Sequence, residues 1–291
     1  MSSSRAGLWW GFLGVALFAL TVPLTRLVVD GMSPVFLTAA RAVVASLIAT
    51  AFLVFRKQPI PTVRQFVRLF AIGAGIVVGF PLFTGLALQT VPASHAAVVV
   101  GLLPAATAVI SVLLTKERPP TRFWVFAIAG VVAVVVFTAT SHGGFGTLQL
   151  EDLYLLLTVV VTAYGYAEGG IVAREIGSWQ TISWTLVAWS PILSVVTVWS
   201  LVNEPLTASP TDWLAFGYMS AVSMYFAFFA WYRGLAIGPV PVVSQVQLTQ
   251  PVMSILWATV ILGEVITLDI LLGGVVVIAC AALAVRTRLS R

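Results

Sequence analysis

Polar side chains gather in one apolar stretch of the chain, at about residues 241–262. One helix face would carry the residues at offsets of 0, 3, 7 and 10, namely Ser244, Gln247, Pro251 and Ser254. Three more polar residues flank this face: Gln245, Thr249 and Gln250. Polar groups are costly in lipid and usually face a bundle interior or a cavity. The pattern favours a cavity wall that hydrogen-bonds the polar head of a substrate; contacts that join two helices are the alternative.

Two titratable residues in apolar surroundings could couple such a site to protons. His95 begins an apolar stretch, and an imidazole titrates near physiological pH, so it could bind substrate, carry a proton or simply cap a helix. Glu168 could carry a proton or bind a substrate ammonium, although its nearness to Arg174 also fits the membrane surface. For Arg41, snorkelling or a carbonyl contact is favoured over substrate binding.

Aromatic residues and prolines complete the set of candidates. Ligand sites are mostly apolar and aromatic, so the substrate path is expected to include some of Trp10, Phe83, Tyr164, Tyr166 and Tyr225. Simple packing is the alternative for each. A proline inside a helix removes an amide donor and frees a carbonyl one turn earlier, which favours gating roles for Pro23, Pro104 and Pro251.

Catalytic and cofactor chemistry find no support in the sequence. It contains no HExxH, GxSxG or GxxxxGK[ST] motif. The single cysteine, Cys280, permits neither an internal disulfide nor a thiolate cluster. We therefore expect no enzyme activity, no metal and no cofactor.

The composition requires lipid as the main solvent. Hydrophobic residues make up 60% of the chain and charged residues 9%, and the mean hydropathy is +1.05. Soluble domains carry about 25% charged residues. The net charge is +5, but the basic residues are scattered singly over short loops. They form no basic patch of the kind that binds nucleic acid, so no nucleic-acid partner is expected.

Apolar windows of about 20 residues predict an all-α membrane protein with ten transmembrane helices. They lie at about 7–28, 34–55, 65–89, 94–115, 121–139, 152–172, 180–201, 212–236, 241–262 and 268–286. With both termini in the cytoplasm, 13 of the 15 Lys and Arg residues fall on the inner side, leaving Arg26 outside and Arg41 within a span. This bias predicts a multi-pass protein of the cell (inner) membrane with cytoplasmic termini.

The chain also contains an internal repeat. Three residues recur 147 positions later: Pro92, Pro104 and Glu117 as Pro239, Pro251 and Glu264. Five spans per half is an odd number, so the second half must insert upside down. Two inverted five-helix repeats are expected, at 1–145 and 146–291. Inverted repeats are typical of secondary transporters that bind substrate near the membrane midplane.

The two copies resemble a known module. Residues 92–117, with their proline and Glu-Arg-Pro ending, and residues 235–283, with Pro251 and Leu262-Gly263-Glu264, are similar to the EamA module of the drug/metabolite transporter superfamily. Ser33-Pro34 followed by Arg41 is similar to the loop and arginine of that family. The resemblance implies ten helices in two inverted halves and export of amino acids, including aromatic ones. Lys116 departs from the pattern, where the family often has glycine.

These observations predict a secondary transporter that works by alternating access. Its expected partners are a small-molecule substrate, such as an amino acid or similar metabolite, and the lipid bilayer. A nucleotide-sugar or other metabolite carrier and a passive channel are the alternatives. The sequence leaves the oligomeric state open, a monomer included.

Overall fold

The computed structural model describes residues 2–116, 120–141, 149–237, 243 and 246–289, and every regular element in these ranges is a helix. Two elements, η1 and η2, are π-helical, η3 is a 3-10 turn and the others are α-helices. In chain order they are α1 (Ser2–Ala19), α2 (Thr21–Val28), α3 (Pro34–Phe55), α4 (Val63–Gly73), η1 (Ala74–Gly79), α5 (Phe80–Ala87), α6 (Ala93–Val100), α7 (Leu103–Thr115), α8 (Thr121–Ser141), α9 (Leu150–Ile176), α10 (Ser178–Asn203), α11 (Pro210–Gly217), η2 (Tyr218–Phe226), α12 (Ala227–Ile237), η3 (Val246–Thr249), α14 (Gln250–Leu262) and α15 (Leu268–Leu289).

Much of this helical bundle is long and apolar enough to cross a membrane. Seven helical stretches within the described residues meet that test, and some of them join two or three elements, as in Val63–Ala87. Three shorter apolar helices accompany them: Thr121–Phe137, Val246–Leu262 and Leu268–Ala284. The prediction of an all-α, multi-pass membrane protein is therefore confirmed.

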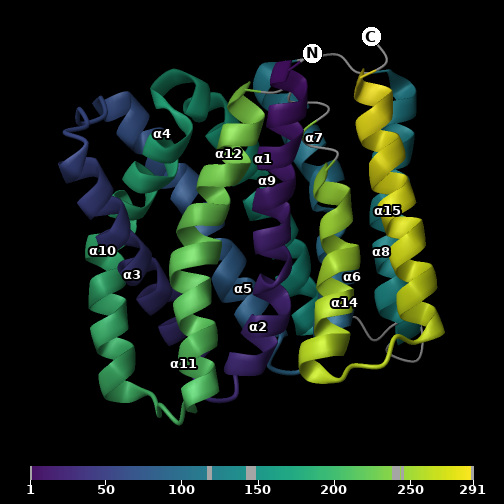
Figure 1. The fold of residues 1–291 in the computed structure, drawn as a ribbon. Helices are drawn as coiled ribbons and strands as arrows, with labels where there is room; N and C mark the ends of the chain where they lie inside the picture. The colour runs from purple at the N-terminus through teal and green to yellow at the C-terminus, as the bar shows by residue number, and fades with distance from the viewer. Residues whose placement is uncertain (1, 117–119, 142–148, 238–242, 244–245, 290–291) are drawn as a thin grey trace.

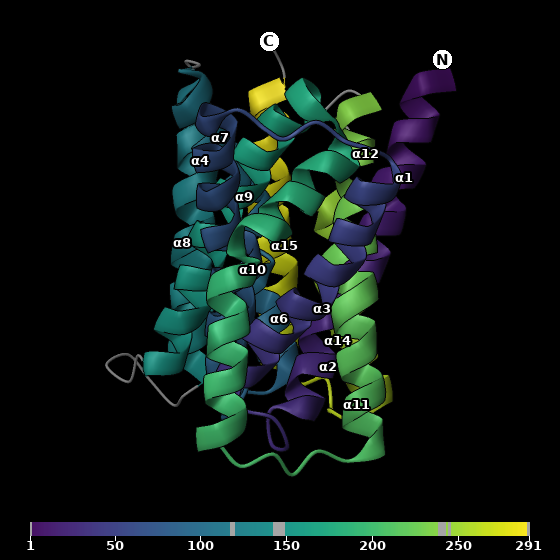
Figure 2. The same cartoon turned by 90° about the vertical axis from the view of Figure 1, so that its left-hand side faces the viewer.

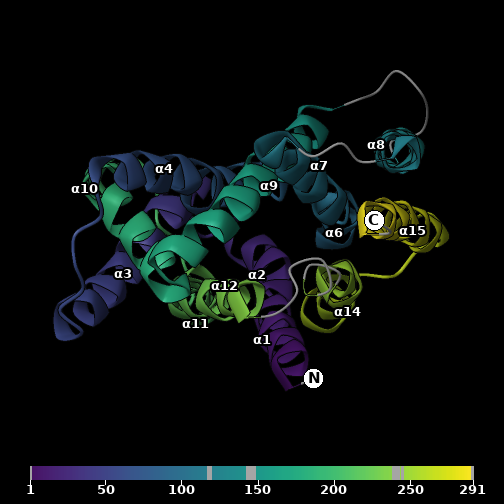
Figure 3. The same cartoon turned by 90° about the horizontal axis from the view of Figure 1, so that it is seen from above.

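The helices run roughly along one common axis (Figures 1 and 2). The chain enters through α1 and leaves through α15 at the same end of the bundle, while the α10–α11 and α14–α15 connections lie at the opposite end (Figure 1). Seen along the axis, α8 and α15 pack together at one edge and α3 and α10 at the other, with α1, α2, α9 and α12 between them (Figure 3).

Local structures recur at the spacing found in the sequence. Helix α7 covers 103–115 and α14 covers 250–262, which is the same range moved by 147 residues. Both helices end in a left-handed residue, Lys116 at φ 56° and Gly263 at φ 69°. Lys116 thus adopts the conformation that glycine adopts at no steric cost. Helices α8 and α15 begin at 121 and 268, again 147 residues apart.

Two capping boxes repeat at the same spacing. The side chains of Thr62 and Gln65 cap the start of α4, and those of Ser209 and Asp212 cap the start of α11, each pair being 147 residues from its counterpart. Such boxes satisfy amide donors that have no partner inside the helix. Each capped helix then passes into a π-helical segment, η1 or η2.

The repeated prolines begin helices instead of bending continuous ones. Pro104 and Pro251 lie in the first turns of α7 and α14, where a missing amide loses no intrahelical hydrogen bond. The expected span at 94–115 is accordingly divided into α6 and α7, with a break at Gly101 and Leu102. Discontinuous helices of this kind occur at transporter binding sites.

Glu264 should stabilise the start of α6 through two charge-assisted hydrogen bonds. The N-cap of α6 is a proline without a capping side chain, and the Glu264 carboxylate accepts from the amides of Ala93 at 2.7 Å and Ser94 at 2.8 Å. We expect Glu264→Ala to lower the free energy of unfolding by about 2 kcal/mol. Asp30→Ala is the control, because its ion pair with Arg26 is exposed. If thermal unfolding showed the same decrease in stability for both variants, the capping role of Glu264 would be contradicted.

Candidate substrate site

A small pocket lies where α2, the α6–α7 break and the η3–α14 junction meet. It is lined by Val22, Ala97, Val100, Leu103, Pro104, Gln247, Gln250, Pro251 and Ser254. Its volume of about 10 Å³ is close to the space that one water molecule requires. Both repeated prolines line this pocket, so the two copies of the motif converge on it.

Amide and hydroxyl groups form the polar wall of the pocket. Gln247 and Gln250 are both buried, and the Oε1 atom of Gln247 has no hydrogen-bond partner among the described residues. Ser254 differs, because its hydroxyl donates to the carbonyl of Ala19 at 2.8 Å. A buried amide oxygen without a donor is costly, so Gln247 can accept a hydrogen bond from a bound polar group.

Other predicted residues of this stretch lie elsewhere. Thr249 is exposed and its hydroxyl donates to the carbonyl of Val246 at 2.7 Å. Thr249 is two residues from both Gln247 and Pro251, which is about 200° of rotation in a helix, so it lies on the side away from the pocket. Ser244 and Gln245 lie outside the described residues.

The five aromatic candidates and Pro23 do not line the pocket in the described part of the chain. Tyr166 is buried in the core against Phe18, Phe228 and Trp231, and Tyr225 bonds to Ser183 at 3.0 Å. Trp10 packs edge-to-face on Phe229, and Phe83 stacks on Tyr154. Tyr164 is half-buried in α9, and Pro23 is buried in the first turn of α2. In this conformation Trp10, Phe83 and Tyr166 pack against other aromatic rings.

His95 forms a buried pair with an acid. Its Nε2 lies 3.1 Å from Oδ1 of Asp152, and both side chains are almost fully buried. The imidazole also packs against the ring of Phe137, at a centroid distance of 4.9 Å. The pair links α6 to the start of α9.

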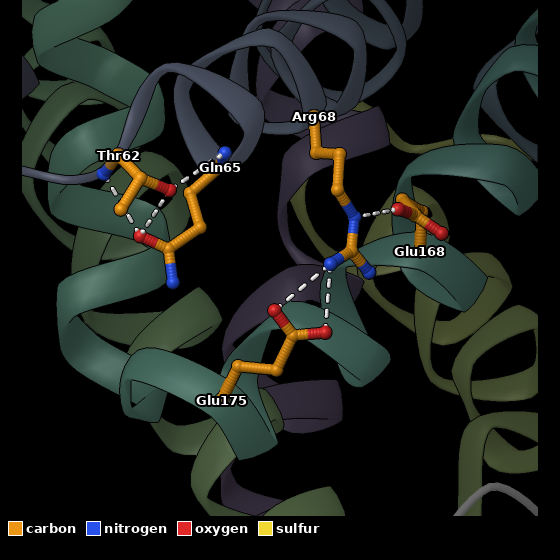
Figure 4. Close-up of polar contacts among 5 residues, drawn as sticks. All are labelled: Thr62, Gln65, Arg68, Glu168 and Glu175. Carbon is orange, nitrogen blue, oxygen red and sulfur yellow. Dashed lines mark hydrogen bonds and ion pairs between the residues drawn. The ribbon is translucent and has the colours of Figure 1, made fainter.

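Glu168 is paired with an arginine (Figure 4). Oε1 of Glu168 accepts from Nε of Arg68 at 2.5 Å, and Nη1 of the same guanidinium donates to both oxygens of Glu175, at 2.7 and 2.8 Å. Arg68 comes from α4, whose start is fixed by the Thr62–Gln65 capping box, while both acids come from α9. We call Arg68, Glu168 and Glu175 the Arg68 triad.

Sequence reasoning missed the partners in both clusters. The sequence indicates neither Arg68 as the partner of Glu168 nor Asp152 as the partner of His95. A signal was present for the triad, because Glu168 and Glu175 are seven residues apart and so share one face of α9. Glu168 is the buried one of the two, and a buried acid requires a cation nearby.

Apolar helices of membrane length around a small buried pocket of amide groups are the features of a membrane transport protein. Residues 5–139 and 149–286 each match the EamA-like transporter family, and the chain therefore belongs to that family.

Several relatives support the assignment along the full chain. The chain is 40% identical over 292 residues to "Uncharacterized transporter YdeK" of Bacillus subtilis, covering 98% of this chain and 99% of the relative. It is 26% identical to "Aromatic amino acid exporter YddG" of Ancylobacter novellus, with all of both chains covered. A solved crystal structure of 20% sequence identity matches 99% of this chain and 100% of its own, with a TM-score of 0.67, which supports the fold alone.

Proposed function

We propose that this chain is a secondary transporter that exports amino acids, including aromatic ones, and similar small metabolites by alternating access. The observation that carries the proposal is the pocket between the α6–α7 break and the η3–α14 junction, where buried glutamine amides face space that Pro104 and Pro251 border. Such groups suit a zwitterion with an apolar side chain. One relative of 26% identity is named an aromatic amino acid exporter, which favours this substrate class.

The proposed architecture has ten spans, arranged as two inverted five-helix repeats at 1–145 and 146–291. The seven long and three shorter apolar helices supply the ten spans. The recurrence of capping boxes and left-handed helix ends at 147 residues supports the two repeats. Helix α3, moved by 147 residues, becomes 181–202 within α10, and these two helices pack side by side. A two-fold axis between the repeats would bring corresponding helices together in this way.

The proposed orientation places both termini in the cytoplasm. The α3–α4 connection, with Arg56 and Lys57, lies at the end of the bundle where the chain begins and ends (Figure 1). The α10–α11 connection, which contains Glu204, lies at the opposite end (Figure 1), and there the amide of Thr207 donates to the carbonyl of Gly31, next to Asp30. Positive charge favours the cytoplasmic side.

Gln250→Ala should raise the KM for amino-acid transport about tenfold, because one hydrogen bond to the substrate is lost. The measurement is uptake of labelled phenylalanine and threonine into proteoliposomes that hold the purified protein. Thr249→Ala is the matched control, because Thr249 is the next residue along the chain but is exposed, and its hydroxyl donates to the backbone carbonyl of Val246. Equal kinetics for both variants and wild type would exclude the pocket as the binding site.

The same vesicles separate the alternatives. A passive channel would conduct without saturation and without exchange of one amino acid for another. A nucleotide-sugar carrier would take up its labelled substrate while phenylalanine uptake stayed at the level of empty vesicles.

A further inference from the structure

A buried guanidinium lies at the interface of α3 and η2, outside the residues that line the pocket. Arg41 is only 3% exposed, although an arginine is almost never fully buried unless it is paired. Its Nη1 lies 3.9 Å from the sulfur of Met219, which is a weak acceptor. Its Nε has no hydrogen-bond partner, and no carboxylate of the described residues forms an ion pair with it.

The groups around Arg41 are also polar and incompletely bonded. Thr38 lies three residues earlier in α3, and its buried hydroxyl has no partner. The hydroxyl of Thr25 in α2 donates to the carbonyl of Thr21 at 2.7 Å and lies 3.4 Å from the Met219 sulfur. We call Thr25, Thr38, Arg41 and Met219 the Arg41 cluster. Because buried polar groups in native proteins are nearly always bonded, two orphaned groups in one cluster indicate a missing polar ligand.

The geometry points to Arg41 as the anchor for the carboxylate of the transported solute, an assignment that rests on the proposed function for the identity of that solute. A guanidinium presents a planar fork of N–H donors that matches a carboxylate with two parallel hydrogen bonds. The Thr38 hydroxyl can donate to a remaining lone pair. An unpaired cation inside a membrane bundle ordinarily marks a substrate or ion path.

Helix α2 connects the Arg41 cluster to the pocket. Val22 lines the pocket, whereas Thr21 and Thr25 of the same helix contact Ser223 and Met219 of η2. The cluster and the pocket therefore share one helix as their common wall. The element that covers Arg41 is π-helical, and such segments are frequent at functional sites because their backbone can rearrange. Movement of η2 away from α3 would open the guanidinium to a ligand.

The test is thermal unfolding of the full chain in detergent with four probes: phenylalanine, 3-phenylpropionate, phenethylamine and inorganic phosphate. We expect the two carboxylates to raise the Tm of the wild type by about 3–5 °C at saturating concentration. Phenethylamine, which lacks the carboxylate, should leave the Tm unchanged, and so should phosphate. In Arg41→Gln the carboxylate shifts should disappear. The Tm of this variant without ligand should equal or exceed that of wild type, because an unpaired buried charge is removed.

Three results would overturn the assignment: carboxylate shifts that persist in Arg41→Gln, a wild type that no carboxylate stabilises, or stabilisation by phosphate alone. Thr38→Val is the second variant, should Arg41→Gln fail to fold, and it should reduce the carboxylate shift. An unchanged shift in Thr38→Val would then count against the anchor. Carboxylate shifts without uptake of amino acids would reject the proposed function and leave the anchor in place.

Discussion

Replacing Arg68 with methionine should lower the free energy of unfolding by about 3 kcal/mol, because Glu168 would remain as a buried carboxylate without its cation. The Glu168 side chain is 10% exposed and pairs with Arg68 at 2.5 Å. The double variant Arg68→Met with Glu168→Gln should recover most of the loss, since neutral replacement of a whole buried pair is usually tolerated. Denaturant unfolding in mixed micelles measures the free energy of unfolding of the single and the double variant.

Glu175→Gln is the matched control for this prediction. Glu175 contacts the same guanidinium but its side chain is 40% exposed, so its ion pair is weakened by solvent. We expect a loss below about 0.5 kcal/mol. A stability of Arg68→Met equal to that of Glu175→Gln would show that burial of Glu168 does not control the energy of the triad.

The Arg68 triad and the Glu264 contacts are both formed in the conformation that has the small pocket. Each joins residues before 145 to residues after 146: the triad connects α4 to α9, and Glu264 connects the end of α14 to the start of α6. Both contacts are formed at once, and the pocket has space for about one water molecule. In an alternating-access cycle, opening toward either side would require carboxylate contacts of this kind to separate.

The helices and the polar face could be predicted from the sequence because both depend on local order along the chain. Gln247, Pro251 and Ser254 do line one pocket, as their spacing of 0, 4 and 7 predicts. The exposed position of Thr249 follows from the same geometry, because it is two residues from both Gln247 and Pro251 and so about 200° away around the helix.

Partners distant in sequence could not be predicted from one chain. Glu168 and Arg68 are 100 residues apart, and His95 and Asp152 are 57 residues apart. Composition and spacing identify such groups as costly in lipid, but the partner depends on which helices pack together. The sequence-based interpretation of Arg41 as a snorkelling or carbonyl-bonded residue also differs from the structure, which encloses its guanidinium beside a sulfur.

Gly75→Ala should be the most damaging single methyl addition considered, with a loss of about 3 kcal/mol. Gly75 belongs to η1, and a Cβ atom there would overlap the carbonyl oxygen of Val161 in α9. A backbone oxygen cannot turn aside as a side chain can, so α9 itself would have to move. Such close approach of helices through small residues is a common packing device in membranes.

For Gly217→Ala the same argument predicts a gain in stability instead of a loss. Gly217 has helical dihedral angles, and a Cβ atom there would meet no heavy atom within 4 Å. Alanine should therefore stabilise the helix by about 0.5–1 kcal/mol. The Tm and the phenylalanine uptake of both variants are measured. A loss in Gly75→Ala alone would be due to the packing contact, whereas a loss in both would show that helix glycines in general do not tolerate substitution. If Gly75→Ala were as stable as Gly217→Ala, the contact of η1 with α9 would be looser than the fold requires.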